Sequence, residues 1–92
     1  MEIRHIYISK SVESKILGKH NVTAKEVREV FSNAYARPKI YRSDRIRKAY
    51  VAYGRTLSGR YLMVAFFLYE NQAKVITARD LTASEKRRYE RK

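Results

Sequence analysis

The feature that most constrains the fold is the run Tyr61–Tyr69, YLMVAFFLY, in which every residue is apolar or aromatic. A run of this length with turn residues before it is typical of a strand that is covered on both faces. The strand-like segments Ala49–Arg55 and Arg60–Tyr69 are joined only by residues 56–59, which is short enough for an antiparallel hairpin. We therefore expect Tyr61–Tyr69 to be the central strand of a sheet.

Three further segments are predicted to be strands. Ile3–Ile8 shows an imperfect alternation of apolar and polar residues. Lys39–Arg42 follows a proline that disfavours helix, and Lys74–Arg79 follows the polar turn residues 70–72. With the hairpin, the last two of these segments give an antiparallel meander of about four strands.

Two helices are predicted between the first two strand segments. Ser11 can cap a short helix over Val12–Lys19, with Asn21 available to end it. Thr23 and Glu26 form a capping box that begins a second helix, which has an apolar stripe. The two helices form a hairpin that packs on the sheet, so the predicted fold class is α+β.

A third helix is predicted to begin near Ala83, because Thr82 and Glu85 form a second capping box. Its only sizeable apolar side chain is Tyr89, and its other long side chains are mostly basic. It has almost no stripe with which to join a core, so we expect it to contact a partner. The alternative is a solvated helix whose cations complement the helix dipole.

Size and charge narrow the function classes. Ninety-two residues predict one domain, 1–92, with one core. The net charge of +12 calls for an anionic partner, with nucleic acid first and an acidic protein second. No run approaches the roughly 18 apolar residues of a membrane span, and no signal peptide is recognisable. Together with the absence of Cys, this predicts a cytoplasmic protein without a membrane partner.

Most catalytic motifs are missing from the sequence. It has no phosphate-binding glycine loop and no HExxH motif, and two His without Cys argue against a zinc site, so no metal or cofactor is expected. Cations, His and Tyr suit metal-independent RNA cleavage, in which the 2′-hydroxyl attacks the adjacent phosphate. His20, Tyr89 or Glu85 could move protons. The cations that could hold phosphate are Lys19, Arg55, Arg79, Lys86 and Arg88.

Three segments, KHNVTAKEVREVF, YGRTLSGR and ITARDLTASEKRRY, resemble in order and spacing the BrnT family of toxins. These are RelE-like proteins of bacterial type II toxin–antitoxin modules. The resemblance implies an endoribonuclease that inhibits translation and growth by cleaving RNA, with ribosome-bound mRNA as one candidate form. It also implies a cognate antitoxin, commonly of the ribbon–helix–helix class, and operator DNA that is bound only through the antitoxin complex.

The resemblance also implies site residues. The matched catalytic candidates are Lys19, His20, Arg55, Arg79 and Tyr89, and the RNA-binding candidates are Arg60, Lys86, Arg87 and Arg88. The chain departs from the family pattern before and within its first helical segment. Ile8 and Ser9 stand where the family has Trp-Asp, Ile16 replaces a frequent Asn, and Asn21 replaces the Gly after the His.

Other interpretations stay open. The chain could be a noncatalytic nucleic-acid-binding module, or a degenerate toxin that only binds its antitoxin, and its charge could serve chiefly to attract an acidic antitoxin. His20 could be a capping or packing residue at the helix corner. Arg79 could form a structural ion pair with Asp80 or Glu85, and Arg55 and Arg60 could be ordinary surface charges.

Overall fold

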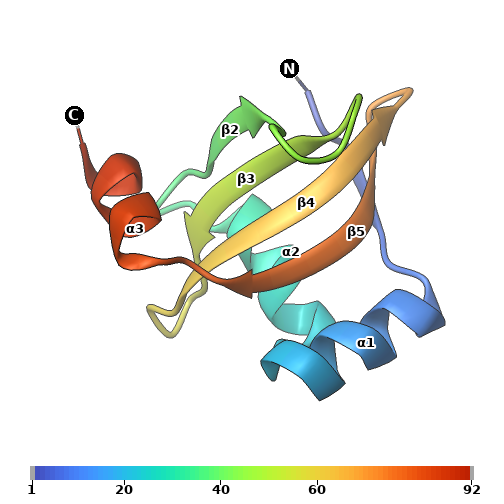
Figure 1. Ribbon diagram of the computed structural model, residues 1–92, viewed down its shortest axis with the longest axis horizontal. Helices are drawn as coiled ribbons and strands as arrows, with labels where there is room; N and C mark the ends of the chain where they lie inside the picture. The colour runs from blue at the N-terminus through green and yellow to red at the C-terminus, as the bar shows by residue number, and fades with distance from the viewer. Residues whose placement is uncertain (1, 92) are drawn as a thin grey trace.

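The α+β fold predicted from the sequence is confirmed by a computed structural model, which describes residues 2–91 (Figure 1). The strands are β1 (His5–Tyr7), β2 (Lys39–Arg42), β3 (Tyr50–Arg55), β4 (Tyr61–Tyr69) and β5 (Gln72–Asp80). The helices are α1 (Lys10–His20), α2 (Ala24–Ser32) and α3 (Ala83–Glu90). Within residues 2–91, no helix is long and apolar enough to cross a membrane.

The sheet has the strand order β1-β5-β4-β3-β2, so β4 is central, as its apolar run predicts. Strands β2 to β5 form an antiparallel meander, and β2 has the predicted bounds. The difference from about four antiparallel strands is β1, which is shorter than Ile3–Ile8 and pairs in parallel with β5. This pairing joins segments that are far apart in the sequence, so no local turn pattern predicts it.

The helical hairpin begins earlier than predicted. The Ser9 hydroxyl accepts a hydrogen bond from the Val12 backbone N–H at 3.2 Å, so α1 is capped by Ser9 and not by Ser11. Asn21 ends α1 in the left-handed conformation, with φ of 53°. The capping box of Thr23 and Glu26 at the start of α2 is confirmed.

Both helices of the hairpin pack on one face of the sheet (Figure 1). At one point α2 and β3 come so close that a Cβ atom on Gly54 would lie 2.8 Å from Val30 Cγ1. A side chain there would force the two elements apart. The buried cluster of this helical face consists of Ile16, Val22, Val27, Val30, Leu62, Val64, Val75 and Ala78.

Helix α3 lies on the opposite face of the sheet, near the end where β3 turns into β4 (Figure 1). Its capping box of Thr82 and Glu85 is confirmed. The sequence predicts almost no contact with the core, but the Tyr89 side chain is only 9% exposed and packs with Tyr53 and Met63. One buried aromatic residue therefore replaces the apolar stripe by which a helix usually docks.

Candidate functional site

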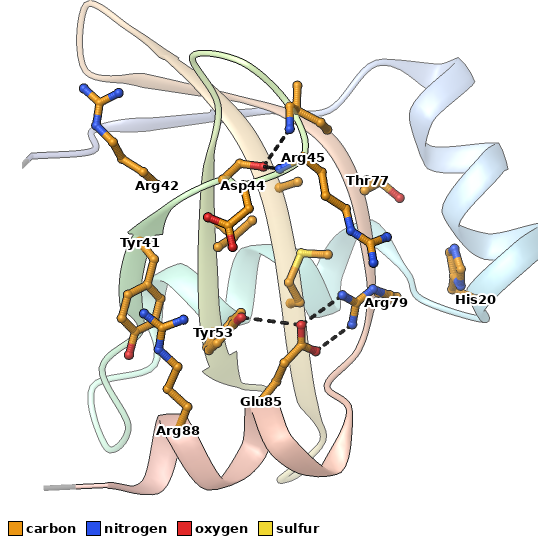
Figure 2. A pocket seen from close by; sticks show the side chains of 15 residues that line it. His20, Tyr41, Arg42, Asp44, Arg45, Tyr53, Thr77, Arg79, Glu85 and Arg88 are labelled. Atoms are coloured by element: carbon orange, nitrogen blue, oxygen red, sulfur yellow. Dashed lines mark hydrogen bonds and ion pairs between the residues drawn. The ribbon is translucent and has the colours of Figure 1, made fainter.

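A groove of about 690 Å³ lies on the sheet face that carries α3 (Figure 2). Its floor is formed by strands β3, β4 and β5, and its walls by α3, the β2–β3 connection and the end of α1. Cations, phenols and two separate carboxylates, those of Asp44 and Glu85, line it. The charged and aromatic polar residues in its lining are His20, Tyr41, Arg42, Asp44, Arg45, Tyr53, Arg79, Glu85 and Arg88.

The centre of the groove is an ion pair between Arg79 of β5 and Glu85 of α3. Two guanidinium nitrogens donate to the two carboxylate oxygens at 2.7 and 3.0 Å. Glu85 also accepts from the Thr82 backbone N–H at 2.9 Å, because it is the third residue of the capping box. The Arg79 hydrogen bonds, with those of Thr82, lower the pKa of Glu85 to about 2. The bidentate pair fixes the plane of the guanidinium within the groove.

Tyr53 extends this pair across the groove floor. Its hydroxyl donates to Glu85 Oε2 at 3.4 Å, and its ring is 7% exposed (Figure 2). Burial, with the adjacent Glu85 charge, raises the pKa of the Tyr53 phenol. Tyr53 is therefore a neutral hydroxyl that can donate or relay a proton at the bottom of the groove.

Further cations form the wall of the groove. The Arg88 guanidinium lies 3.8 Å from the centre of the Tyr41 ring, a distance at which cation–π attraction holds both groups. Arg45 comes from the β2–β3 connection, where Ser43 Oγ accepts from the Arg45 backbone N–H at 3.2 Å. The Arg42 guanidinium at the end of β2 lies instead 5.6 Å from the centre of the Tyr50 ring, which stacks on Phe66 on the helical face. Arg88 and Arg45 lie on the same side of the sheet as Arg79, so the groove attracts anions.

His20 lines the groove at the end opposite Arg88 (Figure 2). It is the last residue of α1, and the left-handed Asn21 that follows turns the chain away. The fold thus brings His20 and Arg79, two of the five predicted catalytic residues, into one groove. It also places Arg88, a predicted RNA-binding residue, in the same groove.

The other three predicted catalytic residues lie outside the lining of this groove. Lys19 is exposed on α1. The Tyr89 hydroxyl donates to the Arg37 carbonyl at 3.1 Å, and burial raises the pKa of its phenol. The Arg55 guanidinium lies 5.1 Å from the centre of the Tyr61 ring, and its buried Nε finds no hydrogen-bond partner within residues 2–91.

Arg60 connects the helical hairpin to the sheet. It donates to both carboxylate oxygens of Asp80, at 2.8 and 3.2 Å, and to both oxygens of Glu26 at 3.2 Å. It also donates to the backbone carbonyls of His20 and Asn21, at 3.0 and 2.7 Å. All three guanidinium nitrogens are engaged, and Arg60 lowers the pKa of Asp80. This geometry gives Arg60 a structural role at the corner that presents His20.

The remaining RNA-binding candidates are on α3. The Lys86 ammonium lies 4.4 Å from the centre of the Tyr61 ring, on the other side of α3 from the groove lining, and Arg87 is exposed. The sequence does not single out Tyr53 or Arg45 for the site. Strand alternation could have placed Tyr53 on the face of Arg55, but no sequence signal indicates that the β2–β3 connection reaches the groove.

Comparison with known proteins agrees with this architecture. No protein-family profile and no curated protein matches the sequence. Among solved structures, the chain is similar to the crystal structure of the Brucella abortus ribonuclease toxin BrnT, with a TM-score of 0.67 and 18% identity. The superposition covers 85% of this chain and 96% of the toxin chain.

The chain therefore has the same α+β fold as this BrnT toxin, as the resemblance in sequence predicts. The structure that provides this match is itself a ribonuclease toxin. At 18% identity, the match establishes the shared fold.

Proposed function

We propose that this protein is an endoribonuclease toxin of a type II toxin–antitoxin module. The observation that carries the proposal is the groove, in which Arg79 is held by Glu85 among further cations, with His20 at one end. The BrnT-like fold supports it, because the similar structure is that of a ribonuclease toxin. Among residues 2–91 there is no group of three or more His, Cys, Asp or Glu side chains that could hold a metal ion.

The chemistry follows from what these side chains can do. The RNA 2′-oxygen attacks the adjacent phosphorus, the bond to the 5′-oxygen breaks, and the products are a 2′,3′-cyclic phosphate and a 5′-hydroxyl. The Arg79 guanidinium stabilises the charge that builds up on the phosphate oxygens. His20 and Tyr53 are the groups that can accept the 2′ proton and supply a proton to the 5′-oxygen.

Glu85 has a different role in this scheme. With a pKa of about 2, its carboxylate is a weak base, so it is poorly suited to take the 2′ proton. Its two hydrogen bonds orient Arg79 toward the groove. Glu85 is therefore a positioning residue, and Arg88 and Arg45 hold the flanking phosphates.

The antitoxin would inhibit by covering the basic groove. Such a partner needs an acidic surface, because complementary charge speeds association with a chain of net charge +12. A ribbon–helix–helix antitoxin would also carry the complex to operator DNA. Toxin, antitoxin and target mRNA would all meet in the cytoplasm.

The test is induced expression of this chain alone in a bacterial host, with growth and total RNA followed. Growth arrest, with fragments that end in cyclic or 3′ phosphate, is the expected result. Arg79→Ala should lower the cleavage rate about 100- to 1,000-fold, the usual cost of losing one group that stabilises a transition-state charge. Lys25→Ala removes the same charge from an exposed position on α2, behind the sheet, and should leave cleavage unchanged.

Two outcomes would contradict the proposal or part of it. Unaltered toxicity of a folded Arg79→Ala variant would remove Arg79 from the mechanism. Normal growth and intact RNA with soluble, folded protein would refute the nuclease. The alternatives would then be a noncatalytic nucleic-acid-binding module, which binds with strong salt dependence but without turnover, or a degenerate toxin that binds only its antitoxin.

A further inference from the structure

The sheet face opposite the helical hairpin, here called the open face, carries a row of solvent-exposed aromatic side chains beyond the groove. Tyr7 is 46% exposed, Phe67 39% and Tyr69 71%. They lie toward the β4–β5 turn, the end of the sheet far from α3 (Figure 1). Burial of three aromatic rings would stabilise a monomer, so their exposure requires an explanation.

The strand register places these rings on one face of the sheet, with Lys74 between Tyr7 and Phe67. Lys74 of β5 is paired with Phe67 of β4 on one side and with Tyr7 of β1 on the other. Residues paired directly across strands share a face, with their Cβ atoms about 5 Å apart. Tyr69 follows two residues after Phe67 and therefore points the same way. Tyr7, Lys74, Phe67 and Tyr69 are named the aromatic row.

The aromatic row faces away from the helical hairpin. Phe66 and Ala73, the neighbours of Phe67 and Lys74 in sequence, are fully buried on the helical face. Ala65, two residues before Phe67, lines the groove. The row and the groove are therefore neighbouring parts of one sheet face. Phe67 lies about 13 Å along β4 from Met63, which is paired with Arg79.

A positively charged side chain lies between the groove and the aromatic row. The register of β4 and β5 shifts between Ala65 and Phe66, and Ile76 has no partner in β4. The Lys15 ammonium donates to the Ile76 carbonyl at 3.0 Å, which places a cation beside β5 between Thr77 of the groove and Lys74 of the row. The row itself contains one cation and no carboxylate.

We infer that the aromatic row is a stacking platform for unpaired bases of single-stranded RNA that extends beyond the groove. This inference rests on the proposed function for the identity of the ligand. Rings that stack on bases, with a cation for the backbone between them, are the elements of sheet surfaces that bind single strands. A duplex does not fit this site, because its bases are already paired and stacked.

The first experiment uses Phe67→Trp, which gives a single fluorescent reporter because the chain has no Trp. The ligand is a 2′-O-methyl oligoribonucleotide of mixed sequence, which cannot be cleaved because it lacks the nucleophilic 2′-hydroxyl. Saturable quenching by the single strand, and none by its duplex with the complement, is the expected result. Equal quenching by the duplex would overturn the inference.

The second experiment compares two exposed tyrosines. Tyr69→Ala, measured with an end-labelled form of the same oligonucleotide, should weaken binding about 5- to 100-fold, the usual effect of losing one stacking ring. Tyr35→Ala is the control, because Tyr35 is 95% exposed in the α2–β2 connection and outside the row. Equal affinities of wild type and Tyr69→Ala, or equal losses in both variants, would overturn the inference.

Failure of the inference and failure of the proposed function are distinguishable. If the uncleavable strand binds through the aromatic row but ordinary RNA is not cleaved, the stacking role of the row is supported and the proposed ribonuclease activity is refuted. If RNA is cleaved equally well by Tyr69→Ala and RNA does not quench Phe67→Trp, only the stacking role of the aromatic row is refuted. Quenching by a bound antitoxin but not by RNA would overturn the RNA assignment and make the row a protein interface.

Discussion

The two faces of β4 are built from different chemistry, although they belong to one strand. On the helical face, Leu62 and Val64 are fully buried in an aliphatic core under α1 and α2. On the open face, Met63 and Ala65 lie under a groove bordered by cations, and α3 is anchored there chiefly by Tyr89. The helical face stabilises the fold by burial, whereas the open face leaves side chains available for a ligand.

The largest expected effect concerns neighbouring residues on the two faces. Leu62→Ala should lower the free energy of unfolding by about 3–5 kcal/mol, because it leaves a cavity in a closed core. Met63→Ala should cost about 2 kcal/mol or less, because the groove is open to solvent and water can occupy the vacated space. Urea unfolding of both variants measures the difference. Equal losses would show that the groove floor is as closed as the helical core.

Arg60 provides the next test, because it joins the helical hairpin to the sheet. Arg60→Ala should lower the free energy of unfolding by about 1–3 kcal/mol, since Glu26, Asp80 and two backbone carbonyls lose a charged donor. Arg60→Lys keeps the charge but cannot reproduce the forked geometry, so it should restore little. Unfolding in urea measures both. If Arg60→Ala leaves the free energy of unfolding unchanged but weakens RNA binding, Arg60 is an RNA-binding residue and not a structural one.

A smaller effect should appear in the pH dependence of stability. The pKa of Glu85 is about 2 in the folded chain, below its ordinary value of 4.5. Its contribution is therefore fully present above about pH 4.5 and is lost as the pH falls toward 2. The full shift corresponds to about 3 kcal/mol, and solvent screening of the partly exposed pair reduces this to the order of 1–2 kcal/mol.

Comparison of the wild type with Arg79→Ala isolates the contribution of the Arg79–Glu85 pair. Asp80 also has a lowered pKa, so it makes stability fall in acid too, but it does so in both proteins and cancels in the comparison. Urea unfolding at a series of pH values should give a steeper loss of stability in acid for the wild type than for Arg79→Ala. Parallel slopes would show that the pair does not stabilise the folded chain.

The smallest effect separates the helices on the two faces. Thr23 and Thr82 cap α2 and α3 with the same hydrogen bonds, and either Thr→Ala change should cost about 1 kcal/mol. In α2, Val27 and Val30 tie the helix to the core, so Thr23→Ala should lower global stability. In α3, Thr82→Ala should appear mainly as faster amide exchange within the helix. Equal exchange in α3 of both variants would argue against this distinction.

These comparisons also explain what the sequence could predict. Both capping boxes, the bounds of β2 and the central place of β4 follow from neighbouring residues or from one apolar run. The parallel pairing of β1, the shifted register at Ile76 and the burial of Tyr89 depend on contacts between distant segments. Local patterns carry no record of such contacts.

The candidate site divides in the same way. The sequence identifies His20, Arg79 and Arg88 as candidates through residue type and resemblance, and the fold brings them to one groove. It does not reveal that Arg60 is fully engaged within the fold, or that Tyr53 shares Glu85 with Arg79. These depend on which side chains meet across the sheet.

The parallel pairing of β1 with β5 determines when the groove can form during synthesis of the chain. The ribosome makes β1 and α1 early, yet β1 pairs with β5, and α1 packs against Val75 and Ala78 of that late strand. Arg79 lies in β5, and Glu85 follows it in α3. Because nascent chains fold as their segments emerge, the groove is assembled last, and a chain stalled before β5 carries no formed site.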